Sequence, residues 1–189
     1  MTNKKMTRKI TADTLRSLPA AKVKELYTAL GPDKVDELQH DWSFWGRDAQ
    51  FPPPDKDWNT WLINAGRGFG KTRCGAEWVR EQVKLGHKRI ACVASTNSDI
   101  ERVMVKGESG FLSVCWKHDK DYNGKLTGFP EWSPTRRSLT WANGAKVEFY
   151  SAEEPERLRG PQFSAAWCDE LAAWNKDIDT WQMLQFCLR

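Results

Sequence analysis

The spacing of hydrophobic residues divides the chain into a helical amino-terminal part and a longer part in which strands and helices alternate. Between residues 11 and 30, leucine and valine recur every three to five positions, a spacing typical of amphipathic helices. Pro19 is expected to split this stretch into two short helices, because proline cannot donate a backbone hydrogen bond. Another turn or two of helix is expected at residues 35–38. These patterns predict a helical segment over residues 1–40 and a larger domain over residues 41–189.

Beyond residue 60, short apolar runs that fit buried strands alternate with helical patterns. Strands are predicted at residues 61–64, 88–95 and 162–168, and a helix is predicted after each of the first two. Strands that alternate with helices in this way predict an α/β fold with a mainly parallel sheet flanked by helices.

Residues 138–150 show the alternation of a β-hairpin added to this sheet. Asn143 and Gly144 stand at its centre, and this dipeptide favours a type I′ turn. Residues 106–134 are rich in glycine, lysine and aspartate, and we expect them to form an irregular surface insertion. Four lysines in the insertion are candidate DNA contacts, although a solvated surface is the better interpretation: Lys106, Lys117, Lys120 and Lys125.

Composition limits the class of protein more than its function. The chain has 189 residues, 40% of them hydrophobic and 29% charged, which fits a domain with a substantial core. The five cysteines are odd in number and form no C-x-x-C pair, which indicates a reducing compartment and no zinc site. No apolar run is long enough to cross a membrane. The net charge of +4 permits contact with DNA without indicating it, and the basic residues 1–10 are expected to be a solvated tail rather than a DNA-binding arm.

A glycine-rich turn between the strand at residues 61–64 and the following helix carries the strongest chemical signal. Strand, glycine loop and helix form the context of a phosphate-binding P-loop, although Ala65 stands where the usual pattern has its first glycine. Backbone N–H groups and the helix N-terminus would hold phosphates, Lys71 would reach the β and γ phosphates, and Thr72 would bind Mg²⁺. The candidate ATP-binding residues of the loop are Gly66, Arg67, Gly68, Phe69, Gly70, Lys71 and Thr72. The alternative is an ordinary glycine-rich turn with an incidental lysine.

Two adjacent acidic residues close the predicted strand at residues 162–168. Asp169 is expected to hold Mg²⁺, directly or through water, and Glu170 to orient and polarise the water that attacks ATP. An Asp-Glu pair is also common on solvated helix starts, but the apolar strand before it and the glycine loop upstream favour the catalytic interpretation.

Arginines can neutralise the charge that develops on a transferred phosphoryl group. Arg67 lies within the glycine loop and is a candidate that acts in cis, while Arg159 is a candidate that reaches a neighbouring subunit's ATP. The alternative for Arg159 is a surface ion pair with one of three nearby glutamates, Glu153, Glu154 or Glu156.

Aromatic residues crowd the stretch between residues 42 and 61, just before the glycine loop. Gln50 and Arg47 in this stretch are candidates for an adenine pocket, in which the amide would read the base edge. An aromatic layer that closes one edge of the sheet explains the same residues equally well.

Five segments occur in this order and spacing, and together they resemble the ATPase domain of the large terminase subunit of tailed double-stranded DNA bacteriophages. The segments are residues 42–50, residues 65–72, the Trp-Ala-Asn-Gly turn at residues 141–144, Leu-Arg-Gly-Pro at residues 158–161 and Trp-Cys-Asp-Glu-Leu at residues 167–171. The resemblance implies an ASCE-type, RecA-like motor that hydrolyses ATP with Mg²⁺ and pumps double-stranded DNA into a procapsid. It also implies a ring on the portal protein, the small terminase subunit as a partner, and the host cell cytoplasm as location.

The chain ends at Arg189, before the family's coupling motif, last core strands and nuclease domain, so it is expected to be a carboxyl-terminally truncated portion without nuclease activity. Two other functions share the glycine loop and the acidic pair. One is a helicase-like DNA-dependent ATPase, and the other is a fragment that binds nucleotide without turnover. A small-molecule kinase fits less well, since it has no use for Glu170 beside Asp169.

Overall fold

The computed structural model describes residues 11–54 and 57–189, and the chain divides into two units, Met1–Asn59 and Thr60–Arg189. The basic tail expected at residues 1–10 lies outside the described residues. None of the helices in the described ranges is both long and apolar enough to span a lipid bilayer.

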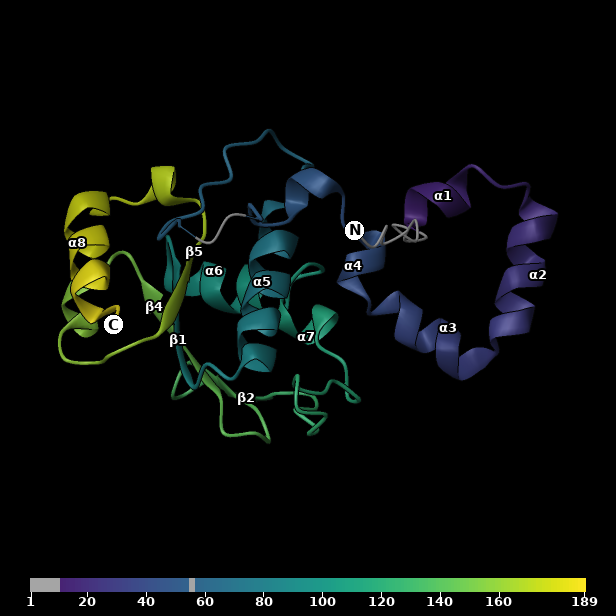
Figure 1. Ribbon diagram of the computed structural model, residues 1–189. Coiled ribbons are helices and arrows are strands. Elements are labelled where there is room, and N and C mark those ends of the chain that lie inside the picture. The colour runs from purple at the N-terminus through teal and green to yellow at the C-terminus, as the bar shows by residue number, and fades with distance from the viewer. Residues whose placement is uncertain (1–10, 55–56) are drawn as a thin grey trace, which may run out of the picture. The chain divides into compact units, whose positions relative to one another are not determined.

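The first unit is helical, as the hydrophobic spacing predicted. Its elements are α1 (Ala12–Arg16), α2 (Ala20–Leu30), α3 (Pro32–Gln39), α4 (Trp42–Trp45) and the 3₁₀ turn η1 (Asp48–Gln50) (Figure 1). Pro19 is the N-cap of α2, so the expected break falls at the proline. Gly31 has φ 75°, a left-handed value that favours glycine, and it separates α2 from α3.

A five-stranded sheet forms the centre of the second unit, with strand order β2-β3-β4-β1-β5 (Figure 1). Its strands are β1 (Arg89–Ala94), β2 (Glu131–Ser133), β3 (Ser138–Thr140), β4 (Lys146–Ser151) and β5 (Ala165–Cys168). β1 pairs in parallel with β4 and β5, whereas β2–β3 and β3–β4 are antiparallel. The α/β class is confirmed, but the expectation of a mainly parallel sheet is wrong. The hairpin joins the sheet itself, and a short connection permits only antiparallel pairing.

The hairpin forms between β3 and β4, but the expected type I′ turn is wrong. Gly144 has φ 83°, while Asn143 is not among the described residues with positive φ, and a type I′ turn requires two such residues. The backbone N–H groups of Gly144 and Trp141 bond to the carbonyls of Trp141 and Ala145, both at 2.9 Å. These bonds close a three-residue loop in which glycine alone takes the left-handed conformation. The Asn143 amide oxygen instead accepts the Ala145 N–H at 2.9 Å.

The strand predicted at residues 61–64 does not form. Its side chains alternate between half-buried and exposed, as in a strand, but Leu62 is 76% exposed and the segment has no sheet neighbour among the described residues. β5 is the last strand in the sheet order, and among the described strands it pairs with β1 alone. A β-pattern becomes a strand only when another strand accepts its hydrogen bonds, which explains the difference.

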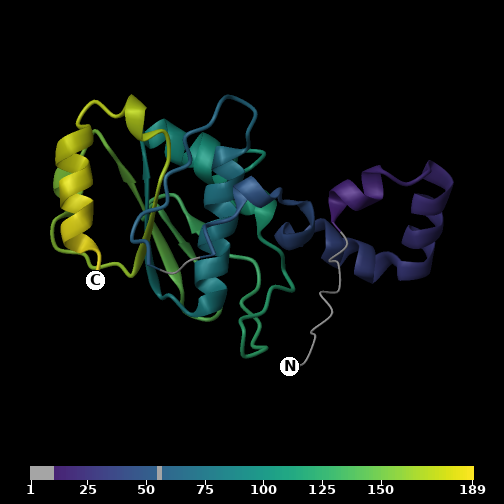
Figure 2. The same cartoon turned by 45° about the horizontal axis from the view of Figure 1, so that its top comes forward.

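Helices cover both faces of the sheet, which Figure 2 shows nearly edge-on. α5 (Lys71–Leu85) and α7 (Phe111–Val114) pack on one face, and α8 (Asp177–Cys187) packs on the other with the 3₁₀ turn η3 (Pro155–Leu158). A further 3₁₀ turn, η4 (Leu171–Ala173), precedes α8 and has no buried residue. β1 contributes alternate residues to both cores: Ile90 and Cys92 face α5, while Ala91 and Val93 face α8.

The segment after β1 is helical, as predicted, with α6 (Asn97–Asp99) continuing into the π-helix η2 (Ile100–Val105). The N-cap is Thr96, whose hydroxyl accepts the Asp99 N–H at 3.2 Å. The expectation that residues 106–134 form only a surface insertion is wrong. Phe111 of α7 is fully buried and forms edge contacts with the rings of Trp141, Phe149 and Trp167.

A buried ion network fixes the loop that follows α7. Nε and Nη2 of Arg80 in α5 donate to the two carboxylate oxygens of Asp119 in that loop, each at 2.6 Å. Arg80 also donates to Glu77 at 3.0 Å, and Lys84 lies 3.0 Å from Asp119. Burial raises the pKa of Asp119, but the hydrogen bonds and positive charges of Arg80 and Lys84 together outweigh burial, and the pKa lies below its usual value. The loop is therefore tied to the helix that follows the glycine turn.

Candidate functional site

The glycine loop, residues 65–70, turns directly into α5, whose first residue is Lys71. Gly68 and Gly70 have φ values of 81° and 91°, in the left-handed region where a side chain would be strained. A Cβ added to Gly66 or Gly68 would meet no atom within 4 Å, so the loop presents its backbone to open space. The first N–H groups of α5 and the positive end of its dipole face the same region.

The start of α5 meets the end of β5 through two neighbouring contacts. The Thr72 hydroxyl donates to Oδ2 of Asp169 across 3.5 Å, although the two residues are 97 positions apart in the chain. Lys71, the residue before Thr72, lies with its Nζ 3.5 Å from Oε1 of Glu170, the residue after Asp169. Nζ also donates to the Ala65 carbonyl oxygen at 3.2 Å, so the ammonium group spans the loop between its first residue and the acidic pair.

A close approach between α5 and β5 sets this geometry. A Cβ on Gly75 would lie 2.0 Å from Cε2 of Trp167, so only glycine allows the helix to approach the indole ring this closely. Trp167 precedes Asp169 by two residues and is 8% exposed, and its ring packs against Phe111. The contact therefore brings the first turn of α5 against the strand that ends at the acidic pair.

Asp169 is held rigidly and is poorly solvated. Its N–H donates to the carbonyl of Val93 on β1 at 2.9 Å, and its carbonyl accepts from the indole N–H of Trp174 at 3.0 Å. The residue is 8% exposed. Burial, followed by the charge of Glu170, raises the pKa of Asp169 to about 6, while Lys71 and the Thr72 hydroxyl act in the opposite direction. A cation placed beside a buried carboxylate stabilises its ionised form.

Glu170 occupies a different environment from its neighbour. It has φ 47° and ψ 48°, a left-handed conformation that is uncommon outside glycine and asparagine, and this turn ends β5 and begins η4. Its side chain is 58% exposed. Two consecutive carboxylates thus differ sharply, one buried against Thr72 and one reaching into solvent beside Lys71.

The oxygen and nitrogen groups gathered here suit a metal-bound polyphosphate. A hydroxyl and a carboxylate are hard oxygen ligands of the kind that Mg²⁺ prefers. The lysine, the glycine backbone and the helix N-terminus are the groups that bind phosphate oxygens in proteins. The residues present therefore fit the predicted ATP and Mg²⁺, and Thr72 and Asp169 are the candidate ligands of the cation.

The structure does not bring every predicted residue into these contacts. Arg67 is exposed at the tip of the glycine loop. Arg159 lies after η3 with a side chain 64% exposed, and its Nε contacts Glu156 at 2.7 Å. Gln50 and Arg47 belong to the first unit, where the Gln50 amide oxygen accepts the Arg47 N–H at 2.9 Å. Their role toward adenine stays a prediction.

Two features of the site escaped the sequence analysis. Asp99 lies close enough to raise the pKa of Asp169 further, and it follows β1, the strand beside β5. The carboxyl ends of neighbouring parallel strands meet at one edge of a sheet, so the position of Asp99 near the acidic pair could have been predicted. The contact of Gly75 with Trp167 left no signal in the sequence, since a glycine within a helical pattern does not reveal its neighbour.

The segment that holds both halves of this site matches a known protein family. A family model described as terminase large subunit, T4likevirus-type, N-terminal, matches residues 62–189. The chain belongs to this family of terminase large subunits. No curated protein and no solved structure matched the chain. Membership confirms the resemblance drawn from the motifs, and it indicates a role in the packaging of phage DNA by a terminase large subunit.

Proposed function

We propose that this terminase chain binds ATP with Mg²⁺ at the glycine loop and hydrolyses it to drive double-stranded DNA into a procapsid. The observation that carries the proposal is the double contact between the two chain segments: Thr72 with Asp169, and Lys71 with Glu170. A loop that binds phosphates and a pair of carboxylates that binds a cation and a water are of use only when they face each other.

The four side chains have separate roles in this proposal. Thr72 and Asp169 hold the cation, which supplies charge neutralisation at the phosphates when it is bound. Lys71 turns from the Ala65 carbonyl toward the β and γ phosphates. Glu170 is the solvent-facing carboxylate, so it is the group that can reach, orient and accept a proton from the attacking water.

The backbone completes the site. The N–H groups of Gly68, Phe69 and Gly70, together with the N-terminus of α5, lie in the stretch that would wrap the phosphates. Arg67 and Arg159 are the candidates that neutralise charge late in the reaction, Arg67 within its own subunit and Arg159 toward a neighbour in a ring.

The proposal is tested by ATP binding and hydrolysis in the chain, with and without linear duplex DNA. Lys71→Ala is expected to abolish binding of a fluorescent ATP analogue in the presence of Mg²⁺. Glu170→Gln is expected to retain binding and to lower turnover by about a hundredfold or more, because it removes the proton acceptor but keeps the side-chain shape. Turnover unchanged by Glu170→Gln contradicts the role of that residue, and binding that survives Lys71→Ala contradicts the site.

A further inference from the structure

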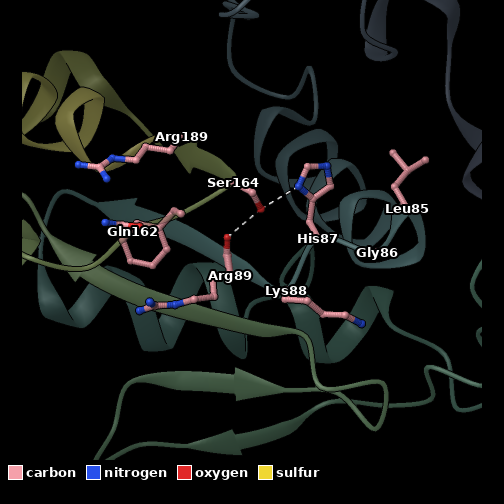
Figure 3. A pocket seen from close by; sticks show the side chains of 9 residues that line it. Leu85, Gly86, His87, Lys88, Arg89, Gln162, Ser164 and Arg189 are labelled. Atoms are coloured by element: carbon pink, nitrogen blue, oxygen red, sulfur yellow. Dashed lines mark hydrogen bonds between the residues drawn. The ribbon is translucent and has the colours of Figure 1, made fainter.

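A cavity lies at the edge of the sheet formed by the amino ends of the parallel strands, opposite the carboxyl ends where the acidic pair lies. The amino ends of β1 and β5 border a cavity of about 550 Å³, between the end of α5 and the stretch before β5 (Figure 3). Asp169 follows the carboxyl end of β5, whereas Arg89 and Ser164 stand at the amino ends of their strands. The cavity is therefore separate from the nucleotide site.

Hydrogen bonds hold the side chains of His87 and Ser164 in place within the lining of this cavity. Nδ1 of His87 lies 2.8 Å from the Ser164 hydroxyl, which in turn donates to the Arg89 carbonyl oxygen at 3.2 Å. The Ser164 N–H donates to the same carbonyl at 3.0 Å. Figure 3 shows the imidazole and the hydroxyl facing each other across the middle of the cavity.

The charge of this edge is positive. His87, Lys88, Arg89 and Arg189 line the cavity, and no carboxylate side chain lines it among the described residues. Arg89 pairs at 3.4 Å with Glu148 on β4, but that carboxylate also pairs with Lys146 at 2.5 Å, so two cations face one carboxylate. Burial raises the pKa of Glu148, but the hydrogen bond and charge of Lys146, together with the charge of Arg89 and the hydrogen bond from Tyr150, outweigh burial, and the pKa lies below its usual value.

The two central cations point apart. In Figure 3 the side chains of Lys88 and Arg89 leave the backbone in opposite directions, on either side of the His87–Ser164 pair. The Lys88 ammonium donates to the Asn143 carbonyl oxygen at 2.9 Å, and the Arg89 guanidinium lies 5.5 Å from the centre of the Phe163 ring. Cations arranged in this way do not converge on one small anion. They match charges spaced along a line, which is the pattern of successive phosphates in a nucleic-acid backbone.

We propose that this edge, defined by His87, Lys88, Arg89 and Ser164, binds the sugar-phosphate backbone of duplex DNA. Lys88 and Arg89 neutralise separate phosphates on either side of the paired imidazole and hydroxyl of His87 and Ser164. The assignment of DNA as the polyanion rests on the proposed packaging function. The contact involves the backbone only, so binding is independent of base sequence and sensitive to salt.

The test measures fluorescence anisotropy of a labelled DNA duplex with the whole chain, at several salt concentrations. Each phosphate contact contributes about 0.9 to the slope of log affinity against log salt, so Lys88→Gln/Arg89→Gln should reduce the slope by about 1.8. Affinity at low salt should fall roughly tenfold. The charge-preserving Lys88→Arg/Arg89→Lys variant should retain both values. Arg157→Gln/Lys176→Gln removes two exposed cations elsewhere and serves as the matched control.

Arg89 has structural contacts, so folding of each variant is checked by circular dichroism and thermal unfolding. If the double variant is unstable, Lys88→Gln alone should lower the slope by about 0.9. An unchanged slope, an equal loss in the control, stronger binding of single-stranded DNA, or no duplex binding by the unaltered chain overturns the proposal.

Binding of a fluorescent ATP analogue, measured in parallel, should be the same in these variants as in the unaltered chain. If the unaltered chain does not bind ATP, the proposed function is contradicted. The dependence of DNA affinity on salt tests the DNA-binding surface independently of that result.

Discussion

Gly75 of α5 lies directly against the indole ring of Trp167 on β5, so closely that an added methyl group would stand 2.0 Å from Cε2 of the ring. The indole cannot move aside easily, because it is 8% exposed and packs against Phe111. This one contact fixes the distance between the helix that follows the glycine loop and the strand that precedes the acidic pair. It connects the packing of the core to the geometry of the site.

Gly75→Ala is therefore expected to destabilise the chain, although alanine is the better helix former. The overlap should lower the free energy of unfolding by roughly 1 to 3 kcal/mol, which exceeds the gain of about 0.5 to 1 kcal/mol from replacing a helical glycine. Urea unfolding measures the change. Adding Trp167→Phe to Gly75→Ala shortens the ring and should recover part of the loss. A Gly75→Ala variant as stable as the unaltered chain contradicts the tight contact.

Asp169→Asn should raise the stability of the chain while it weakens magnesium-dependent ATP binding. Because the pKa of Asp169 is raised to about 6 in the folded chain, ionisation of this group opposes folding as the pH rises from about 4 to above 6. Asparagine removes that cost, and unfolding at pH 7 should require roughly 1 to 3 kcal/mol more. Magnesium-dependent ATP binding should weaken in the same variant. A variant that is less stable at pH 7 contradicts the assigned desolvation of the carboxylate.

The ion network of Arg80 and Asp119 predicts an acid-sensitive contribution to stability. The pKa of Asp119 is lowered by folding, so its contribution is fully present above the unfolded value of 3.8 and is lost as the pH falls through the folded value. Asp119→Asn should cost about 3 to 5 kcal/mol at pH 7, because it removes the carboxylate that accepts two hydrogen bonds from buried Arg80 and leaves Glu77 to balance that charge. The difference from the unaltered chain should shrink below about pH 4.

Urea unfolding at several pH values checks this prediction. Glu101→Gln is the control, since it removes one partner of an exposed pair with Lys106 and should change stability by less than about 1 kcal/mol. An Asp119→Asn cost that stays constant from pH 7 to pH 3 contradicts the ionic origin of the effect.

Arg159 is expected to act on a neighbouring subunit's ATP. Arg159→Ala and Glu170→Gln should each abolish most hydrolysis when present alone in an assembled motor. An equimolar mixture should recover activity, because an Arg159→Ala subunit keeps its own Glu170 and can receive the arginine of a Glu170→Gln neighbour. Arg157→Ala, which alters a similar exposed arginine two positions away, should have little effect. Failure of the mixture to recover activity contradicts action in trans.

The elements that depend on local pattern were predictable from the sequence. α5 and β1 appear where the hydrophobic periodicity placed them, and the acidic pair follows β5 as expected. A glycine loop that begins a helix and an acidic pair that follows a strand predicted that Lys71 and Thr72 face Asp169 and Glu170. The structure contains these contacts, although the strand expected before the loop does not form.

The features that sequence analysis missed depend on neighbours that are distant in the chain. The segment at residues 61–64 has the pattern of a strand but no strand beside it. Asn143 favours a left-handed turn in isolation, yet its amide bonds to the Ala145 N–H instead. Phe111 lies in a polar, glycine-rich stretch, and only the tertiary fold shows that its ring is at the centre of the core. A pattern within a few residues cannot specify such contacts.

The central claim is that the glycine loop and the acidic pair form one metal-dependent nucleotide site. A double-mutant cycle with Thr72→Ala and Asp169→Asn, with the affinity of a non-hydrolysable ATP analogue measured by calorimetry, tests it most directly. If both side chains hold the same cation, their effects should be coupled by about 1 to 2 kcal/mol with Mg²⁺ and should lose that coupling in EDTA. Losses that add independently, or affinity that does not depend on Mg²⁺, would contradict the claim.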